Sequence, residues 1–181
     1  LVQQSLSLLV GQLGPQDHVA IVTYAGSAGT ALPPTPASQK QKILNVINGL
    51  GAGGSTAGAE GIRQAYALAA QNLDPEGVNR VMLATDGDFN VGITSNEELK
   101  GFVERERGKG VFLSVLGFGM GNYNDALMQT LAQNGNGAAA YIDTISEARK
   151  TLVEEASSTL FPIAKDMKIQ VEFNPATVAE Y

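Results

Sequence analysis

The sequence contains no cysteine and no tryptophan, and His18 is its one histidine. The absence of cysteine excludes disulfides, zinc-thiolate sites and thiol nucleophiles, although it leaves the cellular compartment open. With a single histidine, metal binding and acid–base chemistry would depend on carboxylates and hydroxyls. The sequence also lacks an uninterrupted run of about 18 apolar residues, the length that a membrane-spanning helix needs.

Positive charge is scarce and dispersed. The chain of 181 residues carries 12 Lys and Arg against 18 Asp and Glu, a net charge of -6, and its basic residues form no stripe. This balance argues against nucleic acid as a partner. Hydrophobic residues make up 44% of the chain and charged residues 17%, which is typical of one globular domain with a substantial core and excludes a disordered chain.

Strand and helix patterns alternate along the chain. An apolar pattern of helical period begins at Val2 and closes at Gly14-Pro15. A Pro-rich connection through 32–36 leads into a short edge strand, and Ser38 is the expected cap of the next helix. The remaining elements are strands at 18–24, 80–85, 111–116 and 138–142, and helices at 56–72, 96–108, 125–133 and 146–160.

This order predicts an α/β fold, a three-layer α/β/α sandwich around a doubly wound, mostly parallel sheet. The strand at 80–85 is apolar on both faces, which is typical of a central parallel strand. The strands that end at Tyr24, Thr85, Leu116 and Ile142 are expected to run parallel. Glycine-rich loops follow several of them, at the sheet edge where open α/β sheets bind ligands.

Two of these loops carry oxygen ligands. GGST at 53–56 opens a helix, and TDGD at 85–88 follows the strand at 80–85. Together they place a hydroxyl and a carboxylate on adjacent loops, a combination that suits a hard cation such as Mg²⁺. Taken singly, each motif has a plain structural interpretation, in which Ser55 or Thr56 caps the helix and Asp86 starts a turn.

With GGST followed 30 residues later by the TDG turn, the order of strands and helices, and the ending FPIAKDMKIQVEFNPATVAEY, the chain resembles the von Willebrand factor type A (VWA) domains. Within them it resembles bacterial proteins that carry a family-specific C-terminal region. The resemblance implies that Thr56 and Asp86 belong to a metal-ion-dependent adhesion site, with Asp86 bound to the ion through water. Ser55 and Asp88 are further candidates.

The resemblance implies a non-enzymatic protein-binding module. A divalent ion, Mg²⁺ or else Mn²⁺ or Ca²⁺, would be completed by an acidic residue of a protein partner, and a membrane would be reached only through regions outside this sequence. It also suggests a bacterial cell-envelope or extracytoplasmic location. A VWA domain that binds without metal, or serves as a scaffold for the C-terminal region, is an alternative.

The third element of the family motif, Asp-x-Ser-x-Ser at the end of the first strand, is absent from this sequence. We therefore expect residues 1–165 to form a VWA-like domain without its first strand, and 166–181 to begin a connection to a C-terminal region. In the family that strand lies between the strands at 18–24 and 80–85. Three arrangements could close the gap that the absent strand leaves. The two strands could pair directly, a strand from another molecule could fill the gap, or residues upstream of this sequence could fill it. We favour the third.

Other motifs suggest weaker alternatives. Asp86 and Asp88 could be the Asp-x-Asp of a Mg²⁺-dependent phosphatase of haloacid-dehalogenase type, but Asn90 replaces the expected Thr or Val and no acidic pair follows. GxGxG at 117–121 lacks the final glycine of a dinucleotide loop, so a plain loop is favoured. His18 begins a strand far from the glycine-rich loops, which predicts a structural role.

Overall fold

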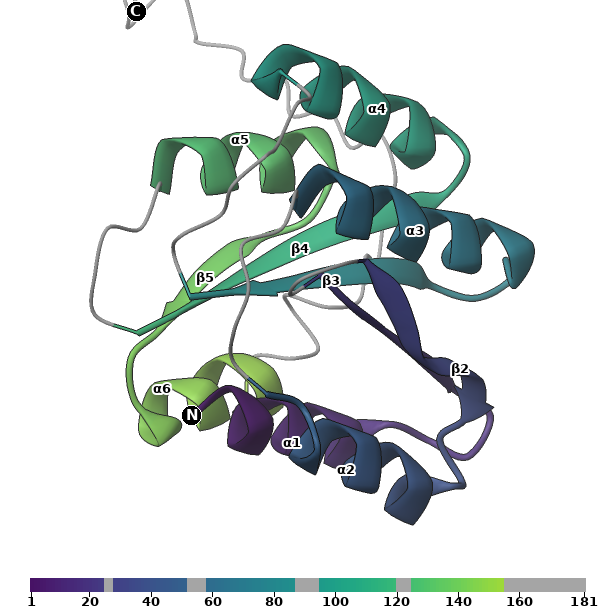
Figure 1. Cartoon of the computed structure of the whole chain (residues 1–181), viewed down its shortest axis with the longest axis vertical. Helices are drawn as coiled ribbons and strands as arrows, with labels where there is room; N and C mark the ends of the chain where they lie inside the picture. The colour runs from purple at the N-terminus through teal and green to yellow at the C-terminus, as the bar shows by residue number, and fades with distance from the viewer. Residues whose placement is uncertain (25–27, 52–57, 87–94, 120–124, 155–181) are drawn as a thin grey trace, which may run out of the picture.

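The computed structural model describes residues 1–24, 28–51, 58–86, 95–119 and 125–154. Helices cover both faces of a central β layer (Figure 1). This arrangement confirms the predicted three-layer α/β/α sandwich. None of the helices in the described ranges combines the length and apolar character needed to cross a lipid bilayer.

Three parallel strands form the larger sheet. They are β3 (Asn79–Thr85), β4 (Val111–Phe118) and β5 (Ala139–Ile142), in the order β3-β4-β5. The ladders run from Asn79↔Val111 to Thr85↔Gly117, and from Val115↔Ala139 to Phe118↔Ile142. All eight residues of β4 are buried, because β4 has a strand on each side and helices on both faces. The parallel arrangement predicted for these three strands is confirmed.

A separate hairpin forms the rest of the β layer. Strands β1 (His18–Thr23) and β2 (Gly29–Pro36) pair antiparallel, with register irregularities on both sides of Ile21. Prolines cannot donate to a ladder, so the Pro-rich β2 is confined to the outer edge of this pair. No residue of β1 is buried.

One face of the β layer carries α3 (Gly58–Gln71), α4 (Asn96–Gly108) and α5 (Asp125–Asn134). Their apolar side chains share a core with the inward residues of β3 and β4. Tyr66 of α3 is 1% exposed, and its ring meets that of Phe102 of α4 edge-on at 5.4 Å between centroids. A capping box at Ser95 and Glu98 sets the beginning of α4, whose bounds match the prediction.

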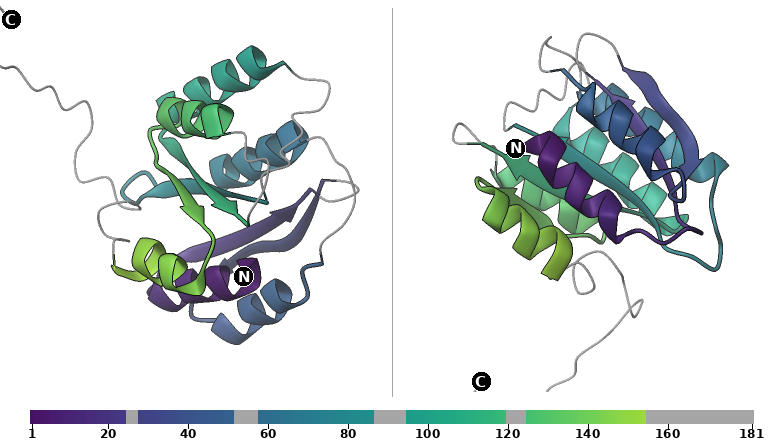
Figure 2. Two further views of the ribbon diagram at one scale, coloured as in Figure 1. Left: turned by 90° about the vertical axis from the view of Figure 1, so that its left-hand side faces the viewer. Right: turned by 90° about the horizontal axis from the view of Figure 1, so that it is seen from below.

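The other face carries α1 (Val2–Gln12), α2 (Lys40–Asn48) and α6 (Ile145–Arg149), and α6 continues as a π-helical turn over Lys150–Glu154 (Figure 2). Apolar residues of α1 join two cores. Val2, Leu8 and Leu9 pack with β4, β5 and α6, whereas Leu6 and Val10 pack with β1, β2 and α2. Helix α1 therefore packs against both sheets on this face of the β layer.

One detail of the sequence-based description is wrong: the N-cap of α2 is Gln39, with no side-chain cap, rather than Ser38. Within the described residues β3 has β4 as its one ladder partner, and no ladder joins β3 to β1. This is the place at which the sequence lacks the first strand of the family motif. Strand β1 pairs with β2 alone, so no ladder tests the predicted parallel run of β1 with β3, β4 and β5.

Candidate functional site at the carboxyl edge of the parallel sheet

Asp86 stands where the sequence placed it. It directly follows β3, and because β3, β4 and β5 are parallel, this is the edge at which Gly119 follows β4 and Asp143 follows β5. Asp86 is exposed, and within the described residues its carboxylate has neither a hydrogen bond nor an ion pair. None of the described residues therefore competes with an ion or a partner for this carboxylate.

The other predicted ligands, Thr56, Ser55 and Asp88, lie outside the described residues. So does Gly121, the last glycine of the GxGxG pattern. Across the described ranges, no cluster of three or more Asp, Glu or His side chains could hold a metal ion. The structure thus describes one member of the predicted site, Asp86, and leaves the hydroxyl ligands as predictions.

Tyr24 approaches this edge from the hairpin. Its hydroxyl donates a 2.9 Å hydrogen bond to the carbonyl oxygen of Ala84, two residues before Asp86. Burial raises the pKa of Tyr24, and the nearby Asp86 carboxylate raises it further, whereas a hydrogen bond with Thr85 lowers it. From the sequence, Tyr24 is only the end of the strand at 18–24, because its hydrogen bond to Ala84 joins residues 60 positions apart and leaves no local signal.

The start of α3 packs closely on Tyr24. A Cβ added to Gly61 would lie 2.7 Å from the Tyr24 Cβ and 3.1 Å from its Cγ, closer than atoms of this kind approach one another. A glycine at this position lets the first turn of α3 lie against the end of β1. Thr56 precedes Gly58, the first residue of α3, by two positions in the sequence.

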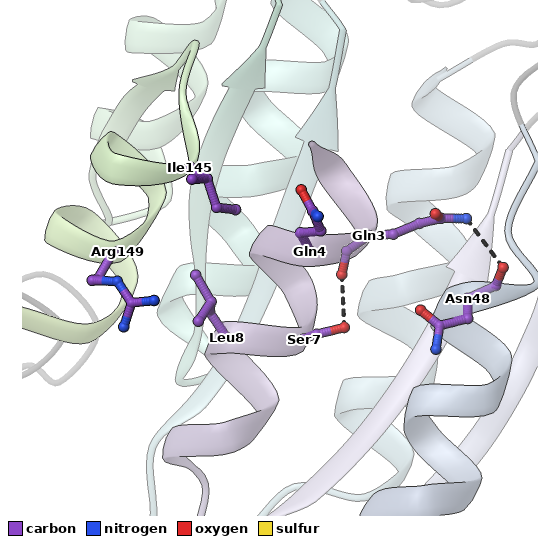
Figure 3. A pocket seen from close by; sticks show the side chains of 7 residues that line it. All are labelled: Gln3, Gln4, Ser7, Leu8, Asn48, Ile145 and Arg149. Atoms are coloured by element: carbon purple, nitrogen blue, oxygen red, sulfur yellow. Dashed lines mark hydrogen bonds between the residues drawn. The ribbon is translucent and has the colours of Figure 1, made fainter.

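A second, shallower feature lies on the opposite helical layer. A groove of about 350 Å³ runs between α1, α2 and α6. Gln3 and Asn48 line it on the side of α2, and Ile145 and Arg149 line it on the side of α6 (Figure 3). Gln3 Nε2 donates to the carbonyl oxygens of Asn48, at 3.1 Å, and Leu50, at 2.8 Å. These bonds tie α1 to the end of α2. None of the predicted metal ligands lines this groove.

Two buried polar atoms, on Tyr66 and Arg80, lie away from the Asp86 edge, and Arg80 is the second residue of β3. The Tyr66 hydroxyl and Arg80 Nε have no hydrogen-bond partner in the described part of the chain. Burial raises the pKa of Tyr66 well above its usual value, and burial lowers that of Arg80. Arg80 Nη1 donates to the hydroxyl of Ser114, at 2.5 Å, and its guanidinium lies 5.9 Å from the Phe112 ring centroid. These residues sit within the packed layers and form no open site.

Comparison with known proteins decides the family. The model of the von Willebrand factor type A domain matches residues 1–155. The chain belongs to the VWA family. A second model, described as the C-terminal region of the uncharacterized protein YfbK, matches residues 158–181. The resemblance found in the sequence, to VWA domains followed by a family-specific C-terminal region, is confirmed.

Relatives and solved structures agree with this assignment. YfbK from Escherichia coli K12 is 49% identical over 181 residues, which are 100% of this chain and 32% of that protein. The chain thus spans about a third of the length of this relative. A von Willebrand factor type A structure from Catenulispora acidiphila superposes with a TM-score of 0.70 at 16% identity, covering 86% of this chain and 36% of that one. It shows the shared fold.

One similar solved structure holds a metal ion at its metal-ion-dependent adhesion site (MIDAS). Proximal thread matrix protein 1 from the mussel byssus, with a zinc-occupied MIDAS motif, superposes with a TM-score of 0.64 at 22% identity. The superposition covers 85% of this chain and 39% of the mussel protein chain. VWA domains are protein-interaction modules that often hold a divalent ion at this motif. The exposed Asp86 carboxylate fits such an ion, because oxygen ligands suit hard divalent cations.

Proposed function

We propose that this domain is a non-enzymatic, metal-dependent protein-binding module. Asp86 and Thr56, with Ser55 and Asp88 as further candidates, hold a divalent ion at the carboxyl edge of the sheet. Mg²⁺ is the proposed ion, and Mn²⁺ or Ca²⁺ would suit the same oxygen ligands. An Asp or Glu of a protein partner completes the coordination. The observation that carries the proposal is the exposed Asp86 carboxylate, which has no hydrogen-bond or ion-pair partner among the described residues, at the edge where α/β sheets bind ligands.

The chemistry of the ligand set accounts for the acidic partner. A neutral hydroxyl and a carboxylate that acts through water leave much of the ion's charge uncompensated. A carboxylate from outside then gains a strong electrostatic interaction and displaces a bound water. The residues of this chain bind and orient the ion, and no step of bond cleavage is assigned to them. The family match gives no support to the phosphatase alternative.

Magnesium affinity tests the proposal. In the intact protein, calorimetric titration with Mg²⁺ should show binding that Asp86→Asn weakens at least about tenfold, since the substitution removes the one charged ligand of the described edge. Asp143→Asn is the matched control, because Asp143 is also exposed and follows β5 at the same edge. Equal weakening by both substitutions, or by neither, contradicts a site at Asp86. Metal-independent partner binding would favour the scaffold alternative.

The facing edges of the two sheets support a second part of the proposal. Of the three ways to close the sheet, direct pairing of β1 with β3 is not found, since the two strands belong to separate sheets. We propose that a strand of the longer polypeptide lies between them. Unpaired backbone groups at such edges cost about 1 to 3 kcal/mol each when buried. A polypeptide that includes the preceding residues should therefore unfold at a higher temperature than residues 1–181 alone; equal melting temperatures would contradict this.

Several earlier expectations remain predictions. These are the domain boundary between 165 and 166, the envelope location, and the ligand roles of Thr56, Ser55 and Asp88. The same holds for the absence of nucleic acid and the indirect contact with a membrane.

A further inference from the structure

The groove between α1, α2 and α6 begins close to the sheet edge that carries Asp86. In the two ladders Thr85 lies one residue level before Ile142, the last residue of β5, so Asp86 is level with the end of β5. The two positions are two strand spacings apart, about 10 Å. Helix α6 begins at Ile145, three residues beyond Ile142. A partner bound to an ion at Asp86 would therefore reach the groove with a short extended segment.

The groove offers an apolar contact next to this edge. Ile145 is 42% exposed, although it is a large hydrophobic residue, and half-buried Leu8 of α1 lines the same groove (Figure 3). A single exposed isoleucine is common on protein surfaces, but here two apolar side chains line one concave surface. An apolar side chain of a partner would leave water by packing against them.

The other lining residues suit the backbone and charge of an acidic segment. Gln4 and Asn48 present side-chain amides, which both donate to and accept from an extended backbone. Arg149 lies one helical turn after Ile145 on the same face of α6, and it has no ion pair among the described residues. A carboxylate of the partner fits this position.

We propose that the groove is a second contact for the protein partner. The partner segment places one acidic residue at the ion of Asp86, an apolar residue at Ile145 and Leu8, and a second acidic residue at Arg149. The inference rests on the proposed function, because the first contact is the ion. Ile145 and Arg149 lie on the β5 side of the parallel sheet, so the strand that we place between β1 and β3 leaves this contact open.

Capped peptides of matched length test the contact in the intact protein at saturating Mg²⁺. An extended chain advances about 3.3 Å per residue, so three residues span the distance from the ion to the groove. The first peptide is acetyl-Asp-Gly-Gly-Leu-Gly-Glu-amide, and in the second Asn replaces Leu. In NMR titrations of the isotope-labelled protein, the leucine peptide should bind about three- to tenfold more tightly, because its side chain leaves water in the groove.

Ile145→Ser should reduce this affinity ratio to about one. Val78→Ser is the matched control, because Val78 is 44% exposed and directly precedes β3 at the opposite edge of the sheet, and it should keep the ratio. A ratio of about one in the unmutated protein, or a ratio that survives Ile145→Ser, overturns the groove contact.

The second acidic contact has its own pair of variants. A peptide with Gln in place of Glu should bind the unmutated protein about twofold more weakly, the effect of an exposed ion pair. This difference should vanish in Arg149→Gln and persist in Arg107→Gln, which alters another exposed arginine, near the end of α4. If Arg149→Gln keeps the difference, the assignment of a carboxylate to Arg149 is wrong.

Calorimetry with Mg²⁺ alone separates this inference from the proposed function. Ile145→Ser should bind Mg²⁺ as tightly as the unmutated protein, because isoleucine supplies no ligand. If Mg²⁺ binds and the leucine peptide has no advantage, the groove contact is wrong while the metal site stands. If Mg²⁺ does not bind, the proposed function is wrong, and the partner contact that begins at the ion is wrong with it.

Discussion

Strands β4 and β1 show how much a strand depends on its neighbours. Both are apolar segments of one β layer with helices nearby, yet every residue of β4 is buried and no residue of β1 is. Strand β4 lies between β3 and β5, whereas β1 pairs with β2 alone. Burial in a sheet therefore follows from lateral pairing as much as from the helices above and below. The parallel sheet should carry most of the stability, and the hairpin should tolerate change.

The sharpest way to test this difference is to add one methyl group in each region. A Cβ at Gly137, beside β4, would lie 1.8 Å from the Leu113 carbonyl oxygen, whereas a Cβ at Gly29 in β2 meets nothing within 4 Å. Gly137→Ala should lower the free energy of unfolding by at least about 3 kcal/mol or prevent folding, because a backbone atom cannot move aside cheaply. Gly29→Ala should change it by less than about 1 kcal/mol.

Urea unfolding of the two glycine variants measures this contrast. Equal losses would show that the hairpin is packed as tightly as the parallel sheet, against the burial pattern of the two regions.

Truncating one apolar side chain in each sheet should give a smaller contrast. Leu113 in β4 is fully buried, so Leu113→Ala should cost about 2 to 5 kcal/mol, including the cavity it leaves. Ile21 in β1 is half-buried and packs at the border of the core under α1 and α2, so Ile21→Ala should cost about 1 kcal/mol. Chemical denaturation checks both values, and a larger loss at Ile21 would contradict the comparison.

Helix caps extend the comparison to the flanking layers. In α4, Ser95 accepts from the Glu98 amide, and Ser95→Ala should lower the free energy of unfolding by about 1 kcal/mol. In α2, beside the hairpin, the side chain of Gln39 makes no capping bond, so Gln39→Ala should be nearly neutral. Thermal melts of both variants measure the difference, and a cost at Gln39 matching that at Ser95 would speak against it.

The two buried tyrosines should differ at alkaline pH. Burial raises the pKa of both, and the shift is greater for Tyr66 than for Tyr24. Above the ordinary tyrosine pKa, about 10, the unfolded chain loses the phenolic proton while the folded chain keeps it, so stability falls as pH rises. Denaturation between pH 9 and about 11.5 should show a shallower fall for Tyr66→Phe than for Tyr24→Phe. Identical profiles would contradict the assignment.

Most of the fold followed from local pattern. Alternating strand and helix signals placed the elements, and the capping signal at Ser95 and Glu98 accompanies a helix whose predicted bounds match those of α4. Within the described residues β3 has a ladder partner on one side only, at the place where the sequence lacks the first strand of the family motif. Its own apolar pattern resembles that of a central strand, because helices cover its apolar residues on both faces. Local pattern carries no information about a missing lateral partner.

The candidate site was predicted in part. A carboxylate directly after a parallel strand must stand at the ligand edge, so Asp86 could be placed from the sequence alone. The contact of Tyr24 with Ala84 could not be predicted, because it joins residues 60 positions apart and a glycine of α3 makes room for the ring. Such contacts arise from packing between elements, which the residue types at either end do not specify.

The position of the ion tests the account most directly. Mn²⁺ added to the isotope-labelled intact protein broadens NMR signals of nearby amides. Signals of Asp86, Gly119 and Asp143, at the carboxyl edge of the three parallel strands, should broaden first, and those of Asn79 and Val111, at the opposite edge, should persist. Asp86→Asn should abolish the selective broadening. Broadening centred on the groove at Gln3 and Arg149, or spread evenly over the surface, would contradict a metal site at Asp86.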